Sequence, residues 1–261
     1  MHQENHALFF LSPLSTHRAI LTKEECRHAC CALRMGDDSV VYGTDGNGKI
    51  YKCRLAAQRG ESIEVDIIET IPQAFLPPLV HLYIGLPEKE AFEEALVGLA
   101  ALGAARIVPL VCNYCQGRWW NPWEKGLERL RRKMISGIKQ AHNPWLPDLR
   151  APQQFLEALH MVCEKAGGRT IRIVADPAGI AVGNTLQGRN PTDRIDCFIG
   201  PPGGFSPDEV HRFSMEGFQF VKVAHYRLRT ELAAIALCAE IIQHFIATNV
   251  HEDRAVLPDV K

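Results

Sequence analysis

The feature that most constrains the fold is a repeated order of strand, helix and strand from residue 79 onward. Leu79–Ile84 is an apolar run typical of a buried strand, and Glu88–Leu102 carries apolar residues at helical spacing. Gly103 is placed to end that helix, and Ala105–Val111 is a second strand. This order predicts a parallel α/β sheet. It continues with helices expected at 123–142, 207–216 and 230–247 and strands at 170–175, 194–200 and 218–223.

The chain from residue 8 to about residue 70 has a different pattern. Ser39–Tyr42 and Lys49–Tyr51 flank Gly43–Gly48, a segment whose glycines and aspartate suit the positive φ angles of a hairpin. One helix is expected near Thr22, an N-cap candidate followed three residues later by Glu25. Short strands joined by such turns predict a small β-barrel.

Prolines mark the expected domain boundary, since Pro72, Pro77 and Pro78 stiffen the chain without continuing a helix or a strand. We therefore predict a β-barrel domain at 1–74 and an α/β domain at 75–250. The segment 251–261 is expected to be a weakly ordered tail.

Composition narrows the class of protein. The 261 residues are 46% hydrophobic and 23% charged, which is enough to bury a core. We find no uninterrupted apolar run of about eighteen residues and no secretory leader pattern, so we expect a cytoplasmic protein with no membrane partner. The net charge of -1 gives no general attraction to a phosphate backbone, and no DNA partner is expected. Local cations do cluster near residues 129–139, although such a run is more commonly a solvated helix face.

The nine cysteines are an odd number in a chain too large to need disulfides, so we interpret them as reduced thiols. Cys112 and Cys115 have the C-x-x-C spacing of a zinc or redox site. No second cysteine pair or well-spaced histidine pair completes a ligand set. Inert thiols are therefore favoured, and no metal is predicted.

The segment with most chemical information runs from Cys197 to Glu209. Paired glycines after an apolar strand let a ligand approach the backbone in the crevice where open α/β sheets bind small molecules. Ser206 is a candidate N-cap with Pro207 at the first helical position. The loop lacks the Walker and G-x-G-x-x-G patterns, which disfavours phosphate binding. A plain tight connection is the alternative interpretation.

A second informative segment is Leu228–Leu237. Thr230 is a candidate N-cap, and the alanines that follow it permit close helix packing. Arg229 has the alternative interpretation of a surface arginine. Glu231 has that of a first-turn carboxylate favoured by the helix dipole.

The order IGPPGGFSPDE (199–209) and then LRTELAAIAL (228–237) resembles the C-terminal knot of the RsmE family, which methylates uridine N3 in small-subunit ribosomal RNA. Cys26–His28, Leu33–Asp37 and the turn at 45–48 resemble the family's PUA-like RNA-binding domain. The resemblance covers roughly residues 8–247. It implies a trefoil-knotted SPOUT domain, S-adenosylmethionine (SAM) bound in a bent form, and a homodimer whose interface adjoins the knots.

The resemblance also implies roles for individual residues. By position, SAM would contact Ile199, Gly200, Gly203, Gly204, Val223, Ala224, Leu228, Arg229 and Thr230. Arg229 would be the catalytic cation near the charge that develops as N3 loses its proton. Residues expected to bind RNA are Arg27, His28, Arg34, Arg131, Arg132, Lys139 and Gln140.

This chain departs from the family's pattern mostly at polar positions, where it carries Gly98, Ala101, Asn113, Tyr114, Asn143 and Pro202. Val223-Ala224 also replaces a Leu-Gly. Fold and cofactor binding therefore follow more directly than the RNA target. Two alternatives stay open: a non-catalytic RNA-binding or ribosome-assembly protein that keeps the knot, and a SPOUT methyltransferase with another RNA target. The expected partner of the leading prediction is ribosomal RNA or the small ribosomal subunit.

Overall fold

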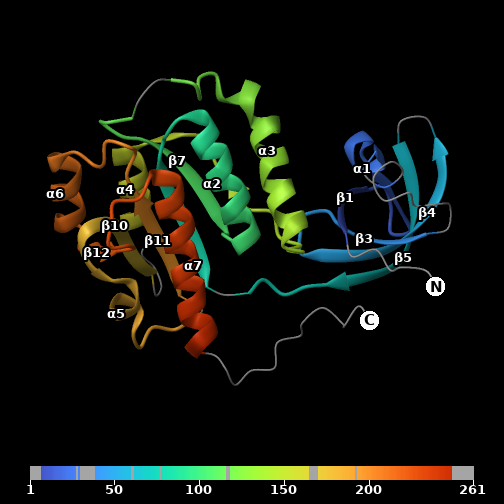
Figure 1. The fold of residues 1–261 in the computed structure, drawn as a ribbon. Coiled ribbons are helices and arrows are strands. Elements are labelled where there is room, and N and C mark those ends of the chain that lie inside the picture. The colour runs from blue at the N-terminus through green and yellow to red at the C-terminus, as the bar shows by residue number, and fades with distance from the viewer. Residues whose placement is uncertain are drawn as a thin grey trace. The chain divides into compact units, whose positions relative to one another are not determined.

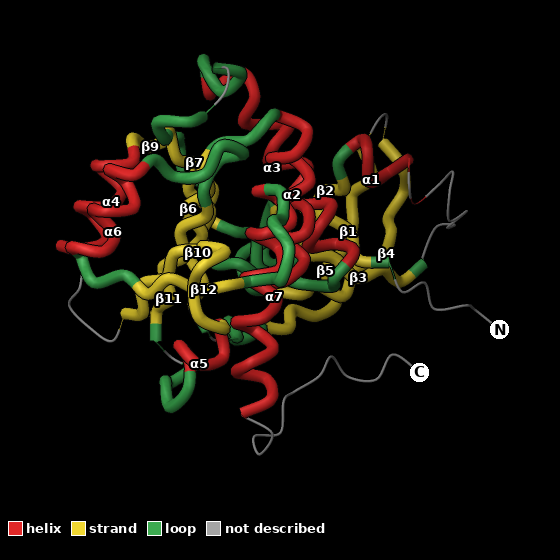
Figure 2. The backbone as a smooth tube through the Cα atoms, turned by 60° about the vertical axis from the view of Figure 1, so that its left-hand side comes forward, coloured by secondary structure: helices red, strands yellow, loops and turns green. Residues whose placement is uncertain are grey.

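The computed structural model describes residues 7–27, 29, 39–59, 62–76, 78–115, 118–164, 170–191 and 193–248. These residues form two compact units (Figures 1 and 2). Of the described residues, the first unit contains those up to Phe75 together with Ile138–Leu146, and the second contains those of Leu76–Gly137 and of Pro147–Thr248. The segment Ile138–Leu146 thus groups with the N-terminal unit, although it follows much of the α/β unit in the sequence.

The first unit is a closed barrel with the strand order β1-β2-β5-β4-β3. All neighbouring strands are antiparallel except β1 and β3, whose parallel pairing closes the barrel. Phe9, Leu21 and Val41 are fully buried inside it. The predicted β-barrel is confirmed. The helix expected near Thr22 is α1, which begins at the next residue, Lys23. The elements are β1 (Leu8–Pro13), β2 (Arg18–Leu21), α1 (Lys23–Arg27), β3 (Val40–Thr44), β4 (Lys49–Arg59) and β5 (Ser62–Pro72).

The β3–β4 hairpin turn requires its glycines. Gly46 and Gly48 have φ angles of 81° and 77°, a region that side chains rarely adopt. The N–H of Gly48 donates to the carbonyl of Pro144 over 2.9 Å, and the N–H of Leu146 donates to the carbonyl of Gly46 over 2.9 Å. A Cβ on Gly48 would lie 2.1 Å from the Trp145 ring. These contacts explain why the segment around Trp145 belongs to the barrel unit.

The second unit is a seven-stranded sheet with the order β12-β10-β11-β6-β7-β8, and β9 also pairs with β7. Every pairing in it is parallel, as the alternation of strands and helices predicted. Its strands are β6 (Leu79–Gly85), β7 (Arg106–Val111), β8 (Asp148–Leu149), β9 (Gln153–Gln154), β10 (Thr170–Ala181), β11 (Arg194–Ile199) and β12 (Gln219–Lys222). Its helices are α2 (Lys89–Leu102), α3 (Trp123–Gln140), α4 (Phe155–Glu164), α5 (Val182–Leu186), α6 (Pro207–Met215) and α7 (Thr230–Thr248).

The two faces of the sheet carry different side chains, because successive residues of a strand point to opposite sides. On the face covered by α4 and α6, Tyr83 and Phe198 stack with ring centroids 4.5 Å apart. Phe213 from α6 packs edge-on against Phe198 at 5.1 Å. Helices α2 and α7 pack together on the other face, where α7 also contacts β6 and β11. The unit is therefore a layered α/β core.

Helix α7 is apolar around most of its circumference. By length and composition, Thr230–Ala247 could cross a membrane. In this structure one stripe of the helix lies in the core, however, with Ala234, Leu237, Cys238, Ile241 and Phe245 at most 1% exposed. A Cβ on Gly98 of α2 would lie 2.7 Å from Cδ1 of Ile235, so the two helices approach closely at that glycine.

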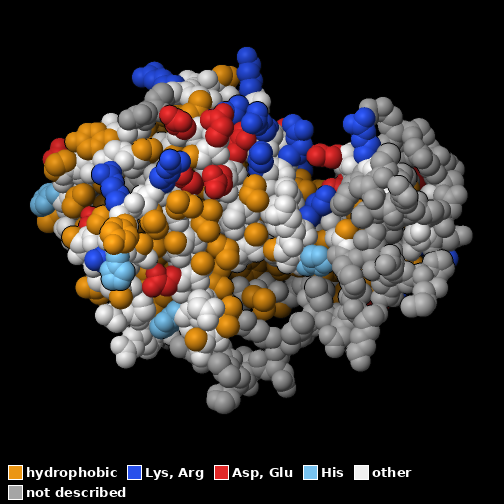
Figure 3. All heavy atoms as spheres, in the orientation of Figure 1, with side chains coloured by type: hydrophobic (Ala, Val, Ile, Leu, Met, Phe, Trp, Pro, Cys, Tyr) orange, Lys and Arg blue, Asp and Glu red, His pale blue; other side chains and the backbone are white. Residues whose placement is uncertain are grey.

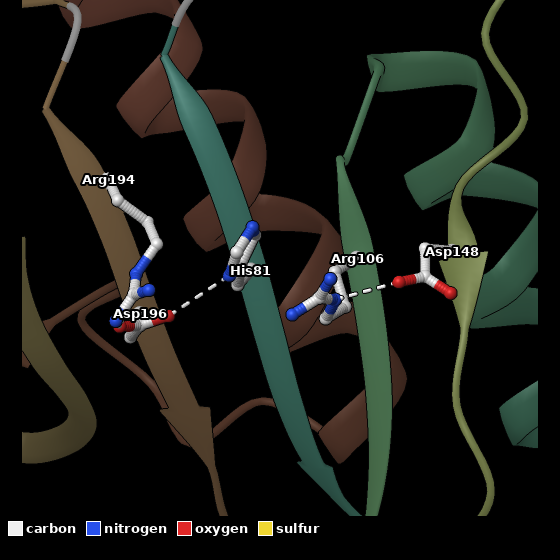
Figure 4. Close-up of polar contacts among 5 residues, drawn as sticks. All are labelled: His81, Arg106, Asp148, Arg194 and Asp196. Atoms are coloured by element: carbon white, nitrogen blue, oxygen red, sulfur yellow. Dashed lines mark hydrogen bonds and ion pairs between the residues drawn. The ribbon is translucent and has the colours of Figure 1, made fainter. Parts of the chain in front are cut away.

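A row of charged side chains crosses the amino-terminal ends of the strands (Figure 4). Asp196, His81, Arg106 and Asp148 are cross-strand neighbours on β11, β6, β7 and β8. The buried Asp196 accepts from Arg194 Nη2 at 2.8 Å, and its other oxygen lies 3.2 Å from His81 Nδ1. Arg106 Nε lies 2.9 Å from Asp148. These contacts join β11 to β6 and β7 to β8 at the end of the sheet that is opposite the glycine-rich loop.

Two glycines of α3 provide a matched test of the packing between α2 and α3. A Cβ on Gly137 would lie 2.3 Å from the backbone oxygen of Val97, whereas a Cβ on Gly126 meets nothing within 4 Å. We expect Gly126→Ala to stabilise the protein by about 0.5–1 kcal/mol, since alanine favours the helix. We expect Gly137→Ala to destabilise it by about 1–3 kcal/mol through overpacking. Urea unfolding of both variants checks this, and equal effects would contradict it.

Candidate functional site

The glycine-rich loop runs from the end of β11 to the start of α6. Ser206 and Glu209 form a capping box, in which the Ser206 N–H donates to Glu209 Oε2 over 2.7 Å. Ser206 as N-cap with Pro207 in the first turn is confirmed. A Cβ on Gly85 would lie 2.4 Å from the backbone nitrogen of Pro201, so the loop packs directly on the end of β6. Its conformation is therefore set at both ends.

The loop between β12 and α7 is bonded to this glycine-rich loop. Thr230 Oγ1 donates to the carbonyl of Gly200 over 2.9 Å, and Arg227 Nη2 donates to the carbonyl of Pro202 over 2.9 Å. The two stretches around residues 200 and 229 thus lie side by side, as the two motifs predicted. Close passage of these segments is also what the expected trefoil knot requires.

The predicted N-cap role of Thr230 is wrong. Helix α7 begins at Thr230 itself, and the carbonyl of Arg229 accepts the first helical bond, from the N–H of Ala233 over 2.8 Å. Arg229 is therefore the capping residue. The Thr230 hydroxyl is used to hold the other loop, a role that only the tertiary structure reveals.

Together the two loops form most of a cleft of about 700 Å³, a size typical of small-molecule sites. Gly203 is the one predicted cofactor contact that does not line the cleft, although it lies in the same loop. A Cβ on Gly203 would lie 2.8 Å from the Cβ of Tyr114. The predicted residues that line the cleft are Ile199, Gly200, Gly204, Val223, Ala224, Leu228, Arg229 and Thr230.

The cleft also contains residues that were not predicted. Asp176 and Pro177 line it because β10 continues to Ala181 through an irregularity in its pairing with β12. Asp176 Oδ1 accepts from the N–H of Ala178 over 2.7 Å, which fixes the turn. The available signal was an Asp-Pro pair directly after a buried strand, where α/β sheets commonly bind ligands. Pro87 and Glu88 also line the cleft and were not predicted, although they too follow a buried strand, between β6 and α2.

Charges of both signs surround the cleft. The Arg229 side chain is 85% exposed, and its Nη1 lies 4.0 Å from the buried carboxylate of Glu231. Arg227 adds a second cation, and Glu88 and Asp176 add carboxylates. Such a lining suits a ligand that itself carries an ammonium, a carboxylate and a further positive charge.

The residues predicted to bind RNA are distributed over both units. Arg27 is exposed at the end of α1, whereas Lys139 pairs with the buried Glu25 of the same helix. The Lys139 charge is thereby compensated within the barrel unit. His28 and Arg34 lie outside the described residues.

Helix α3 carries the remaining predicted RNA contacts. Arg132 and Gln140 are exposed, and Arg131 is half-buried. Two other cations of this helix bind the buried Glu93 of α2, with Arg129 Nε at 2.6 Å and Lys133 Nζ at 3.7 Å. Part of the basic face of α3 therefore holds the two helices together.

Several departures from the RsmE pattern have structural roles here. Gly98 allows α2 to approach α7 closely, and a side chain there would meet Ile235. The Asn113 N–H donates to Glu209 Oε1 over 2.9 Å, and its Nδ2 donates to Ser206 Oγ over 2.9 Å. Asn113 thus supports the capping box. Asn143 Oδ1 accepts from the N–H of Trp145 over 3.0 Å and helps to fix the segment that joins the barrel.

Comparisons with known proteins agree with this geometry. Residues 76–242 match the family described as RNA methyltransferase domain. The chain is 29% identical over 212 residues to Ribosomal RNA small subunit methyltransferase E of Synechocystis sp., covering 80% of this chain and 67% of that protein. It is 24% identical over 236 residues to the protein of the same name from Aquifex aeolicus, covering 87% and 94%.

Two solved structures share the fold. One is a ribosomal RNA small subunit methyltransferase E from Neisseria gonorrhoeae bound to S-adenosyl methionine, with a TM-score of 0.76, 24% identity and coverage of 91% of this chain and 97% of that chain. The other is a probable rRNA-methyltransferase from Porphyromonas gingivalis, with a TM-score of 0.75, 24% identity and coverage of 93% and 100%. The predicted resemblance to RsmE is confirmed. Because the family match spans more than half of this chain, the chain belongs to the RNA methyltransferase domain family.

Proposed function

We propose that this protein transfers a methyl group from SAM to N3 of a uridine in 16S ribosomal RNA. The observation that carries the proposal is the cleft formed by two backbone stretches joined through Thr230 and Gly200 in a chain of this family. The relatives named as small-subunit ribosomal RNA methyltransferases support the same reaction class. Such a substrate would place the protein in the cytoplasm.

The residues of the cleft fit SAM. Gly200 has little room for a side chain, since a Cβ there would lie 3.2 Å from Gly204 Cα and from the Phe205 nitrogen. Gly200 and Gly204 line the cleft without side chains, and backbone amides and carbonyls can recognise an adenine. Glu88, Asp176, Arg227 and Arg229 offer charged partners for an amino-acid moiety. When bound, SAM supplies an electrophilic methyl group.

Arg229 is our candidate for the catalytic cation. Uridine N3 must lose its proton as it is methylated, and a guanidinium nearby would stabilise the developing negative charge. The side chain is largely exposed at the rim of the cleft, where a base from a second molecule can reach it. Its contact with Glu231 is long, at 4.0 Å, so little interaction energy is lost when the arginine turns toward a substrate.

RNA binding is proposed for both units. The barrel unit, which covers most of the predicted domain 1–74, would clamp the RNA through Arg27, His28 and Arg34. In the second unit, Figure 3 shows Lys and Arg side chains gathered over α3, where Arg131 and Arg132 lie. A target base inside folded RNA must be unstacked before it reaches the cleft, and cations on the phosphates would stabilise that state. Lys139 and Gln140, at the end of α3, are also proposed to bind the RNA.

A homodimer is proposed through the outer face of α7. Leu232 and Ile246 are 45% and 38% exposed, and Ala239 and Ile242 continue the same stripe at helical spacing. Figure 3 shows hydrophobic side chains gathered over this helix. An apolar surface of this kind typically marks a protein interface, and this one begins beside the cleft, as expected for an interface that adjoins the two loops.

The experiment that tests the function is methyl transfer from labelled SAM to small ribosomal subunits that lack the modification, followed by primer-extension mapping. We expect label in 16S RNA at one uridine. Binding of SAM without transfer to RNA would instead favour a non-catalytic RNA-binding protein. Label at another kind of nucleotide would favour a SPOUT enzyme with a different target.

The hydroxyl of Thr230 should be necessary for the shape of the cleft. In Thr230→Val the carbonyl of Gly200 loses its partner, which costs about 1–3 kcal/mol and should weaken SAM binding roughly tenfold. Thr230→Ser keeps the donor and should bind nearly as the parent does. Calorimetric titration with SAM measures both, and equal losses in the two variants would contradict the proposed role.

Removal of the Arg229 guanidinium should affect the reaction more than cofactor binding. We expect Arg229→Ala to lower kcat by about 100-fold or more, as for loss of one transition-state donor. Arg212→Ala, at an exposed arginine in the last turn of α6, is the control and should leave kcat unchanged. A loss of SAM affinity as large as the loss of kcat would show that Arg229 only binds the cofactor.

The dimer should be sensitive to charge on α7. Ile246→Glu places a carboxylate on the apolar stripe, so we expect a shift from dimer to monomer in light scattering after size exclusion. Met215→Glu, on the 74% exposed Met215 of α6, is the matched control and should remain dimeric. A parent protein that is monomeric at micromolar concentration would refute the homodimer.

A further inference from the structure

The Cys112 and Cys115 pair has no role in the proposed methyl transfer, yet its geometry is specific. The two residues close a β-turn after β7, in which the Cys115 N–H donates to the Cys112 carbonyl over 3.1 Å. The Cys112 N–H in turn donates to Cys115 Sγ over 3.2 Å. The Cα atoms at the ends of a β-turn are within about 7 Å of each other, a separation that a disulfide can bridge.

We propose that Cys112 and Cys115 form a reversible disulfide by exchange with a low-molecular-weight disulfide, with Cys115 as the attacking thiol. Cys115 is partly exposed, whereas Cys112 is only 6% exposed, so an external disulfide reaches Cys115 first. Cys112 needs no access to solvent, because it reacts only with its neighbour in the turn. The other described cysteines are Cys26, Cys53, Cys163, Cys197 and Cys238, and only Cys163 is not buried.

The electrostatics of the pair assign the same roles. The hydrogen bond from the Cys112 thiol, with help from the backbone N–H groups of Cys112 and Leu86, lowers the pKa of Cys115 to about 7 against the opposing effect of burial. The same thiol contact and burial raise the pKa of Cys112. The thiolate is the nucleophilic form, so the lowered pKa of Cys115 favours it as the attacking thiol, and the raised pKa of Cys112 keeps the proton on that sulfur.

The chemistry balances with oxidised glutathione as the co-reactant. The Cys115 thiolate attacks one sulfur of that disulfide, a mixed disulfide forms, and one glutathione thiolate leaves. The Cys112 sulfur then attacks Cys115 Sγ as its proton is lost, and the second glutathione thiolate leaves. Two electrons pass from the two protein sulfurs to glutathione, and the two protons end on the two glutathione thiols.

The turn is connected to the cleft, which gives the disulfide a structural consequence. Asn113, inside the turn, donates to Glu209 and Ser206 of the capping box that follows the glycine-rich loop. Tyr114, also inside the turn, lies against Gly203. Closing the disulfide brings the two sulfur atoms to about 2.05 Å. We expect this to shift Asn113 and Tyr114, so that the oxidised protein binds SAM more weakly. This consequence rests on the proposed function, whereas formation of the disulfide does not.

The test is incubation of the full chain with oxidised glutathione. The unreduced protein is then digested, and its peptides are mapped by mass spectrometry. We expect a peptide with residues 112 and 115 joined and two hydrogens lost, and we expect dithiothreitol to reverse it. Cys163 is the internal control, because burial raises the pKa of its thiol. At pH 7 Cys163 should take up glutathione more slowly than Cys115, because its thiolate fraction is smaller. Equal labelling of both sites, or no joined peptide, would overturn the proposal.

Two variants separate the roles of the thiols. Cys112→Ala should trap glutathione on Cys115 as a mixed disulfide, and the midpoint of the reaction rate against pH should rise from about 7 toward that of an ordinary thiol, because the donor is gone. Cys112→Ser should also trap glutathione but keep the low midpoint, since its hydroxyl can still donate. The same midpoint in both variants would refute the assigned hydrogen bond.

Calorimetry with SAM on reduced and oxidised protein tests the connection to the cleft. We expect at least a several-fold weaker affinity after oxidation, restored by dithiothreitol and absent in Cys115→Ser. An unchanged affinity would refute the effect of the disulfide on the cleft, but it would not refute formation of the disulfide. No binding by the reduced protein would instead overturn the proposed function, so the two failures are distinguishable.

Discussion

The contact between the Thr230 hydroxyl and the Gly200 carbonyl is the interaction on which the site depends. It joins two loops that are thirty residues apart, and the cleft exists only where they meet. Each loop is held separately at its base, the first by the capping box of α6 and the second by the start of α7. This hydrogen bond, together with that from Arg227 to the Pro202 carbonyl, therefore connects two already ordered loops, which limits the entropy lost in forming the site.

The rest of the α/β unit makes these loops rigid. Parallel strands place the carboxyl ends of β6, β10, β11 and β12 at one edge of the sheet, and the loops leave from that edge. The opposite edge carries the ion pairs around Asp196, where structural charges do not compete with a ligand. The proposed chemistry and the charges that stabilise the sheet are thus separated by the length of a strand.

Departures from the family's polar pattern acquire a physical interpretation in this arrangement. Gly98 has no side chain, which allows close packing between α2 and α7. Asn113 donates hydrogen bonds to the two residues of the capping box. Both changes support the shape of the glycine-rich loop or its neighbouring helix.

The elements with a strong periodic or capping signal were predicted from the sequence. The helix that ends at Gly103 and the hairpin at Gly46 and Gly48 follow from local rules, since a left-handed residue has few solutions other than glycine. Helix α4 was missed, although it spans Phe155–Glu164, because no recognised start or stop signal marked it. The two-residue strands β8 and β9 are too short for any periodicity.

The sequence by itself determined the parallel α/β order, the barrel and the two loop motifs, because each of these is written in residues close together along the chain. Only the tertiary structure decided that Thr230 bonds Gly200 instead of capping its helix, that Asp176 reaches the cleft through an irregular strand, and that Trp145 belongs to the barrel unit. The physical reason is that these contacts join residues far apart in sequence. The packing of whole helices and strands determines which residues meet in these contacts, so a local sequence pattern does not predict them.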